Sequence, residues 1–248
     1  MDAVWEWFVW LNEAYGIKLT IFYDDYDRRR FFNGLWHTVA LSGICIVLSL
    51  LIGVVGAWLQ GSHLTWTRRL VQGYIQCFRN TPPLVQLYFF YFGVSALLPT
   101  VETDWGGQAP LLDSFQWAVV SLSFFAGAFN VEIFRAGMEA VPRATVEAAE
   151  ALGYTRLQIY RHVVLPLALR FCWPALTSNM VNLLKTTTLA YAIAVPELLY
   201  VSNQIWSDEF NVPEMMNVLL VVYLLLVGVL VWAMHRWERA MRVPGFGH

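Results

Sequence analysis

The sequence predicts an all-α membrane protein, and its composition, apolar segments and distribution of basic residues all support this fold class. Of its 248 residues, 58% are hydrophobic and only 14% are charged, whereas about 25% of residues are charged in a typical soluble domain. Several apolar stretches approach the roughly 20 residues that a helix needs to cross the hydrocarbon core. Because lipid cannot hydrogen-bond to the backbone, we expect these stretches to be helical.

The first element is a segment of residues 1–31, which precedes a transmembrane domain at 32–248. Trp5, Trp7 and Trp10 lie near its start, among tyrosines and acidic residues. This composition is typical of the membrane–water interface. We therefore expect an interfacial segment on the outer face of the membrane.

Five spans are predicted in the domain, at residues 35–59, 70–98, 115–135, 163–196 and 215–235. The second contains Pro82 and Pro83, which remove backbone donors and favour a kink or break. The fourth is too long for one simple span and contains Pro166, Pro174 and a lone lysine, Lys185. We interpret it as a broken helix with a re-entrant or unwound part.

Basic residues orient the spans, because cytoplasmic loops retain lysine and arginine. They follow the first, third and fifth spans, at Arg68, Arg69, Arg143, Arg156, Arg161, Arg170, Arg236, Arg239 and Arg242. The two other connections have acidic residues and no basic ones, at Glu102, Asp104, Asp113, Glu197, Asp208, Glu209 and Glu214. The N-terminus is thus predicted outside and the C-terminus inside. Arg28, Arg29 and Arg30 oppose the rule, and we expect Asp24, Asp25 and Asp27 to offset them.

Two classes of ligand are not expected. The formal net charge of −2 offers no broad basic surface for nucleic acid. The histidines and cysteines lack metal-ligand spacing; they are His37, His63, His162, His235, His248, Cys45, Cys77 and Cys172.

The connection between the third and fourth spans carries a spaced motif. It reads Glu147-Ala148-Ala149, three residues, Gly153, nine residues, then Val163-Val164-Leu165-Pro166. Residues 144–152 are mostly good helix formers, glycine can end a helix in the left-handed conformation, and proline can start a fresh element. A compact helical knob is therefore expected on the cytoplasmic side.

This motif resembles the coupling loop of ABC import permeases, with valine in place of isoleucine at Val163. The resemblance implies a short helix, a turn at the glycine and a second helix. The coupling loop comprises about residues 139–166. Further likeness to permeases for polar amino acids lies in residues 78–87, 132–135 and 183–190. The resemblance implies a type I ABC importer permease core in the bacterial cytoplasmic (inner) membrane. It covers residues from about Phe32 to the C-terminus, so residues 1–31 are identified only as a periplasmic or interfacial segment.

The resemblance also implies partners. The coupling loop would dock on a cytoplasmic ABC ATPase dimer, while a second permease, identical or paralogous, and a periplasmic amino-acid-binding protein would complete the importer among the membrane lipids. The chain has no glycine-rich loop ending in Gly-Lys-Ser or Gly-Lys-Thr, so ATP-Mg is expected on the ATPase. No cofactor or enzymatic activity is expected in this chain.

Charged and polar residues at membrane depth are candidates for the substrate pathway, because charges there are costly. Each has a structural alternative. Arg79 could bind a carboxylate or lie at the interface, Glu132 could face an amino group or pair with Arg135, and Lys185 could bind a carboxylate or act as an internal counter-ion. Asn179 and Asn182 could line the same cavity or join helices. The candidate set also includes Asn80, Thr81, Thr186 and Thr187.

Two other functions remain open at this point. The importer could carry another small solute, such as an opine or a compatible solute, in place of glutamate, aspartate, glutamine or a basic amino acid. Alternatively, Glu132, Arg135 and Lys185 could form an ion or proton pathway in a stand-alone secondary carrier.

Overall fold

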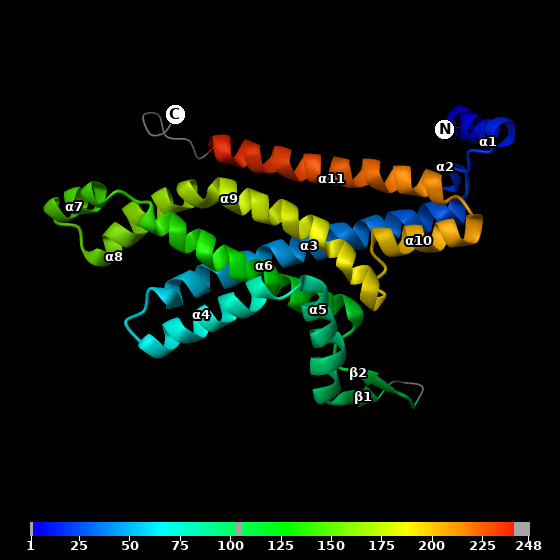
Figure 1. Cartoon of the computed structure of the whole chain (residues 1–248). Coiled ribbons are helices and arrows are strands. Elements are labelled where there is room, and N and C mark those ends of the chain that lie inside the picture. The colour runs from blue at the N-terminus through cyan, green and yellow to red at the C-terminus, as the bar shows by residue number, and fades with distance from the viewer. Residues whose placement is uncertain (1, 103–105, 241–248) are drawn as a thin grey trace. The chain divides into compact units, whose positions relative to one another are not determined.

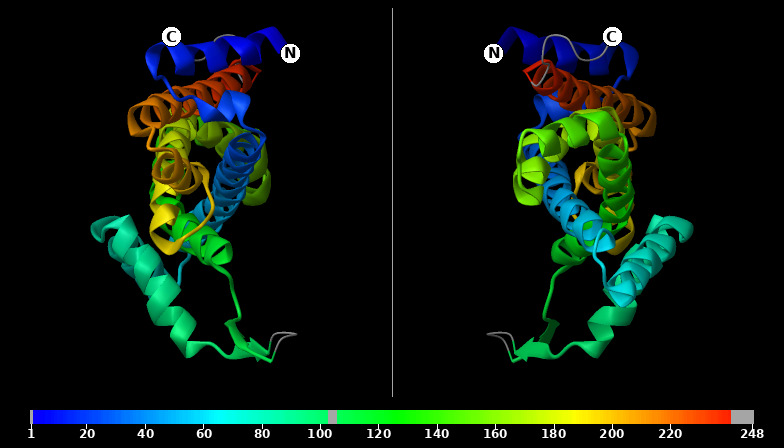
Figure 2. Two further views of the ribbon diagram at one scale, coloured as in Figure 1. Left: turned by 90° about the vertical axis from the view of Figure 1, so that its right-hand side faces the viewer. Right: turned by 90° about the vertical axis from the view of Figure 1, so that its left-hand side faces the viewer.

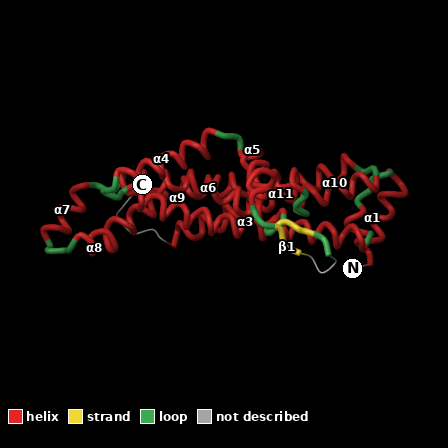
Figure 3. Tube along the Cα trace, turned by 90° about the horizontal axis from the view of Figure 1, so that it is seen from below, coloured by secondary structure: helices red, strands yellow, loops and turns green. Residues whose placement is uncertain are grey.

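The computed structural model describes residues 2–102 and 106–240. Three predicted features, the acidic Asp104, the basic Arg242 and the terminal His248, lie outside these residues. The described chain is almost entirely helical, with one pair of short strands (Figure 3). It divides into two compact units, each of which gathers segments from distant parts of the sequence.

The helices of Figure 1 follow one another with short connections. In the first half of the chain they are α1 (Asp2–Tyr15), α2 (Thr20–Tyr23), α3 (Asp25–Gln60), α4 (Thr65–Asn80), α5 (Pro83–Tyr88), the π-helix η1 (Phe89–Val94) and the 3-10 helix η2 (Ser95–Leu97). In the second half they are α6 (Ser114–Glu139), α7 (Arg143–Ala151), α8 (Arg156–Ile159), the π-helix η3 (Tyr160–Val164), α9 (Leu165–Thr186), the 3-10 helix η4 (Thr187–Ile193), α10 (Leu198–Glu209) and α11 (Val212–Ala240).

Among the described residues, three helices are long and apolar enough to cross a membrane by length and composition. They are α3, α6 and α11, which contain the first, third and fifth predicted spans. The second predicted span is divided at Thr81 and Pro82 into α4 and the α5–η1–η2 segment, as its two prolines predict. The fourth predicted span is also divided, but not at its prolines. The chain stays helical through Pro174 and changes to a 3-10 helix only at Thr187.

Unit 1 comprises Met1–Ile44, Pro83–Leu122 and Leu184–Gly228. Its apolar core joins the start of α3 to α10 and the first half of α11, with Ile21, Phe31, Leu198, Val201, Ile205, Met215 and Leu219 buried. A short antiparallel hairpin follows η2, pairing β1 (Thr100–Glu102) with β2 (Gln108–Pro110) in the register Val101 opposite Ala109. This hairpin was not predicted from the sequence, and Figure 2 shows it beyond the end of the α5–η1–η2 segment.

Unit 2 comprises Cys45–Pro82, Ser123–Leu183 and Val229–His248. Its core is built by the second half of α3, α4, the second half of α6 and α9. Here α3 and α6 lie unusually close. A Cβ on Gly53 would lie 2.5 Å from Asn130 Cβ, and one on Gly56 would lie 2.4 Å from Val131 Cγ2. Only glycine permits this approach, which is typical of membrane helix packing.

Two of the three arginines that oppose the charge rule form ion pairs within unit 1. Arg28 pairs with Asp25, and Arg30 lies 3.5 Å from Asp27 and 2.9 Å from Asp208. The expected compensation by Asp25 and Asp27 is therefore confirmed, and Asp208 adds to it from α10. Asp24 has a different role, because its Oδ1 accepts hydrogen bonds from the backbone N–H groups of Tyr26 and Asp27 at the start of α3.

Candidate functional site

The coupling loop has the predicted helix–turn–helix form. α7 ends at Ala151, and Gly153 has a φ of +82°, so glycine is needed at the turn. The backbone N–H of Gly153 donates to Glu150 O at 2.9 Å, and that of Tyr154 donates to Ala149 O at 3.2 Å. These bonds satisfy carbonyl groups that the helix end would otherwise leave free. Figure 1 shows α7 and α8 beyond the C-terminal end of α6.

The second helix of the loop begins with a capping box. Thr155 Oγ1 accepts from Gln158 N, and the Gln158 side chain accepts from Thr155 N at 2.8 Å. Both bonds are local, so α8 starts where the sequence alone places a cap. The loop therefore holds its shape through contacts within a few residues.

The surface of the loop is partly apolar. Leu152 is 77% exposed and Leu157 is 75% exposed, at the two sides of the Gly153 turn. Of the signature residues, Glu147 and Ala148 are also exposed, while Ala149 is buried. The loop therefore has one largely exposed leucine on each side of its turn.

Pro166 does not start a fresh element, contrary to the prediction. Helical backbone runs from Arg156 to Thr186, and Pro166 is the second residue of α9. Because proline has no N–H to donate to residue 162, the preceding turn cannot close as an α-helix. The N–H of Leu165 instead donates to Tyr160 O, which widens this turn into the π-helix η3.

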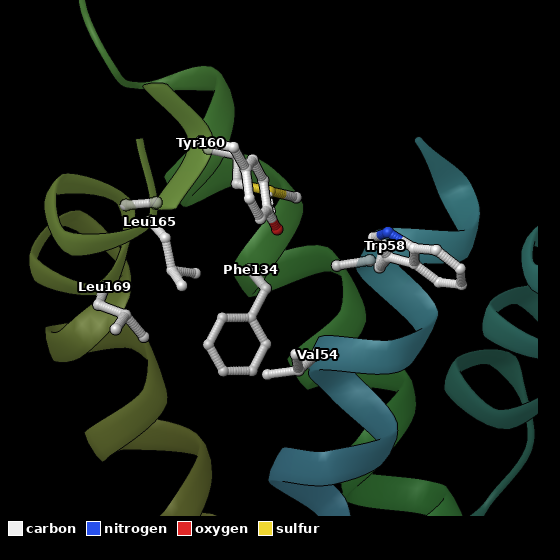
Figure 4. A pocket seen from close by; sticks show the side chains of 9 residues that line it. Val54, Trp58, Phe134, Tyr160, Leu165 and Leu169 are labelled. Atoms are coloured by element: carbon white, nitrogen blue, oxygen red, sulfur yellow. Dashed lines mark hydrogen bonds between the residues drawn. The ribbon is translucent and has the colours of Figure 1, made fainter. Parts of the chain in front are cut away.

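A small apolar pocket lies where the coupling loop joins unit 2 (Figure 4). Val54 and Trp58 line it from α3, Phe134 from α6, and Tyr160, Leu165 and Leu169 from η3 and α9. The Tyr160 hydroxyl is 3.9 Å from Met138 Sδ on α6. The loop is thus connected to two helices of unit 2 through apolar side chains.

The candidate charges are paired differently from the prediction. Arg79, at the end of α4, pairs with Glu132 on α6, and its guanidinium carbon lies 5.2 Å from the centre of the Phe129 ring. Arg135 pairs with Glu139 at 3.0 Å. The predicted alternative of a Glu132–Arg135 ion pair on one helix face is therefore wrong, because α4 lies close enough for Arg79 to pair with Glu132. The Arg79–Glu132 pair joins two helices of unit 2.

The side chains after Arg79 bind their own helix end. Asn80 Nδ2 donates to Gln76 Oε1 at 2.8 Å, and the Thr81 hydroxyl donates to Cys77 O at 2.8 Å. Both residues are exposed. They therefore close the end of α4 in this structure, beside the break at Pro82.

Asn179 joins helices within unit 2. Its Nδ2 donates to Asn130 Oδ1 at 2.8 Å and to Ala126 O at 3.1 Å, and Asn130 Nδ2 donates to Ser49 Oγ at 3.1 Å. The three buried side chains connect α9, α6 and α3. Of the two predicted alternatives for Asn179, the structure thus supports the interhelical hydrogen bonds. Asn182 is exposed on the next turn of α9.

Lys185 and its neighbours lie where the fourth predicted span changes conformation. Lys185 is exposed, and within the described residues of unit 1 no carboxylate lies at ion-pair distance from it. Thr186 ends α9. Thr187 is fully buried, and its hydroxyl donates to Leu184 O at 2.7 Å. In this structure, Lys185 is thus an accessible cation, whereas Thr187 anchors the start of η4.

Sequence reasoning missed Glu197 as a candidate, because it counted this residue among the acids of an outer connection. Glu197 is instead fully buried in unit 1. Its carboxylate accepts from Leu199 N at 3.0 Å, from Tyr200 N at 2.8 Å and from the Tyr223 hydroxyl at 3.1 Å. The sequence signal was its position just before an apolar helix, where an acidic side chain can cap.

No metal centre is indicated in the described part of the chain, where no three His, Cys, Asp or Glu side chains are grouped. The side chains described above offer fixed charges, hydrogen-bonding groups and apolar contacts. Such groups can bind a zwitterion or a partner protein, and can transmit movement.

Comparison with known proteins adds evidence from the whole chain. The family model described as "Binding-protein-dependent transport system inner membrane component" matches residues 49–243. The octopine transport system permease protein OccM of Rhizobium radiobacter is 32% identical over 203 residues, which cover 77% of this chain and 82% of OccM. The glutamate/aspartate import permease protein GltJ of Escherichia coli (strain K12) is 27% identical over 251 residues, which cover 99% of this chain and 98% of GltJ.

One solved structure, of "an amino acid ABC transporter with histidines", resembles the fold with a TM-score of 0.74 and 26% identity, covering 86% of this chain and 94% of that chain. The similarity extends to the coupling loop and to the candidate residues after it, since both lie inside the matched segment.

Proposed function

Because the chain belongs to the family of binding-protein-dependent transport system inner membrane components, we propose that it is the permease subunit of an ATP-driven importer of polar amino acids. It lies in the inner membrane, crossing it with several apolar helices. Its relatives are permeases of amino-acid transport systems. The chemistry of energy supply and the chemistry of solute binding then belong to different parts of the assembly.

The observation that carries this proposal is the coupling loop. It is a helix–turn–helix whose two most exposed leucines, Leu152 and Leu157, flank the Gly153 turn. A cytoplasmic ATPase would bury these side chains in a groove, and burial of a leucine stabilises a contact by about 1.5 to 3 kcal/mol. The partner would bind ATP-Mg, and its closure on ATP would move the loop.

The pathway is assigned to charged residues that can bind both ends of an amino acid. Lys185 is an accessible cation that would hold the α-carboxylate in unit 1. In unit 2, the Arg79–Glu132 pair presents a cation and an anion, each partly exposed, that would exchange partners with a passing zwitterion. Asn80, Thr81, Arg135, Asn182 and Thr186 are near these groups in sequence and complete the proposed pathway. A second permease would supply its other wall.

A polar amino acid is the solute class that fits these groups best. Relatives transport octopine in one case and glutamate or aspartate in another, according to their names. Both ligands share an α-amino group and a carboxylate, for which a lysine and an Arg–Glu pair are suitable contacts. A periplasmic binding protein would choose the side chain and deliver the solute.

Reconstitution tests the proposal. The chain is purified with its native partners, the bound solute is identified by mass spectrometry, and uptake is measured in proteoliposomes. We expect uptake only when the ATPase, ATP and the binding protein are all present. Uptake by this chain alone, driven by an ion gradient, would identify a secondary carrier instead. An opine or a compatible solute on the binding protein would change the solute class but not the mechanism.

A further inference from the structure

The segment that follows Lys185 is strained in two respects. η4 (Thr187–Ile193) is a 3-10 helix of seven residues, whereas 3-10 runs longer than about four residues are uncommon. It ends at Ala194, a residue with a Cβ that nevertheless has a φ of 57°. The left-handed conformation is unfavourable for a residue with a Cβ. Surrounding contacts must therefore hold this segment in place.

Both ends of η4 are anchored within unit 1. At the start, the buried Thr187 hydroxyl donates to Leu184 O. At the far end, Glu197 is 0% exposed and its carboxylate accepts three hydrogen bonds, two from the first N–H groups of α10 and one from the Tyr223 hydroxyl of α11. The two α10 donors are the N–H groups of Leu199 and Tyr200, whereas the N–H of Leu198, which begins α10, donates to Thr38 Oγ1 of α3 at 2.9 Å. The end of η4 is thus joined to three helices.

These anchors set the length and rotation of the segment. A 3-10 helix rises about 2.0 Å per residue and an α-helix about 1.5 Å, so seven residues differ in length by about 3.5 Å. They also differ by about 20° of rotation per residue, because the two helices have 3.0 and 3.6 residues per turn. If the far end of η4 were released, Thr187–Ile193 could continue α9 as an α-helix. Each side chain of this segment, which follows Lys185 closely, would then change its position.

We propose that Glu197 is a positioning residue for translocation, which holds η4 unwound through Tyr223 and the N-terminus of α10. Its carboxylate opposes the relaxation of η4 and so keeps the side chains that directly follow Lys185 and Thr186 in their present orientation. This inference rests on the proposed pathway role of Lys185. It assigns no contact with the solute to Glu197, which has no exposed surface.

The test uses the intact complex with its ATPase and binding protein, in proteoliposomes. The variants Glu197→Ala and Tyr223→Phe remove the carboxylate and one of its donors. Tyr200→Phe is the matched control, because the Tyr200 ring packs against Tyr191 and the core of unit 1 while its hydroxyl forms no hydrogen bond within the described residues. The measured quantity is the number of solute molecules taken up per ATP hydrolysed, which does not depend on how much complex assembles.

We expect uptake per ATP to fall at least about tenfold in Glu197→Ala and about threefold in Tyr223→Phe, with the wild-type ratio in Tyr200→Phe. The proposal would be overturned if Tyr223→Phe and the assembled Glu197→Ala complexes both took up as much solute per ATP as the wild type. Glu197→Gln sharpens the test, because its amide cannot accept bonds at both terminal atoms. We expect the uptake per ATP of Glu197→Gln to lie between those of Glu197→Ala and the wild type.

A second readout follows the conformation of η4 directly. In a chain without Cys45, Cys77 and Cys172, a cysteine replaces the exposed Tyr191 and is labelled with a membrane-impermeant maleimide. We expect Glu197→Ala to lower the labelling rate at least about threefold, as rotation of the segment turns this position toward packed side chains. An unchanged rate would mean that Glu197 does not hold η4.

The proposed pathway role of Lys185 is tested separately from the role of Glu197. If Lys185→Ala transports like the wild type, the pathway assignment fails whatever the Glu197 variants do. If Lys185→Ala loses transport while the Tyr223 and Glu197 variants keep both the uptake ratio and the labelling rate, only the role of Glu197 fails.

Discussion

The coupling loop and η4 are both short helical segments that interrupt the long helices, but their shapes have different origins. The loop is held by bonds between residues no more than five apart, such as Gly153 N to Glu150 O and the Thr155–Gln158 capping box. The end of η4 is held by residues 26 and 160 positions away, through Glu197–Tyr223 and Leu198–Thr38. A local shape can be read from spacing, whereas a shape held by distant contacts cannot.

The largest effect is expected at the locally determined turn. Gly153→Asp places a Cβ and a negative charge at a φ of +82°, and should lower solute uptake by at least about tenfold while the permease still inserts. The measurement is uptake together with ATP hydrolysis in the assembled complex. Gly153→Asn should retain more uptake, because asparagine tolerates the left-handed conformation. Wild-type uptake in Gly153→Asp would mean that the conformation of this turn is not needed for coupling.

Gly73→Ala is the control for that variant. Gly73 lies inside α4 with an ordinary helical backbone, and a Cβ there meets no atom within 4 Å. We expect uptake at the wild-type level.

The next effect is expected beside the distantly held segment. Lys185→Ala should lower uptake by about fivefold to tenfold while ATP hydrolysis by the assembled complex continues, because it removes a cation from the proposed pathway. Lys185→Arg should restore part of the uptake, since it keeps the charge. Loss of assembly in Lys185→Ala, with no effect on the uptake of the remaining complexes, would favour a structural role for this lysine.

A smaller effect is expected on stability from the interhelical amides. Asn130→Leu removes the acceptor of Asn179 and the donor to Ser49, and leaves buried polar groups without partners. We expect a loss of about 1 to 3 kcal/mol, seen as a lower Tm of the purified permease in detergent. Asn217→Leu, at an exposed residue of α11, is the control and should leave the Tm within about 1 °C. An unchanged Tm in Asn130→Leu would mean that apolar packing alone joins these helices.

The smallest effect is expected at the left-handed alanine. Ala194→Val adds branching at a φ of 57° on an exposed residue, and should destabilise the fold by about 1 kcal/mol. Ala194→Gly should cause little change, because its freedom in the folded state is offset by its freedom in the unfolded chain. Thermal unfolding of both variants, compared in one detergent, checks the difference. If the valine variant were as stable as the glycine variant, the backbone at Ala194 would not be strained.

Much of the fold could be predicted because the bilayer restricts the possible structures. Apolar length located α3, α6 and α11, and the prolines located the break after α4. The ion pairs of Arg79 and Arg135 show what could not be predicted. Their spacing to Glu132 was compatible with several pairings, and the choice depended on how close α4 lies to α6.

The sequence by itself determined the membrane class, the family resemblance and the shape of the coupling loop, because periodicity, charge and turn chemistry act over a few residues. Only the tertiary structure decided which polar groups meet. It placed Asn179 on Asn130, carried the helix past Pro166 through a π turn, and buried Glu197 against Tyr223. Those outcomes depend on the distance between helices, and spacing along one chain does not specify that distance.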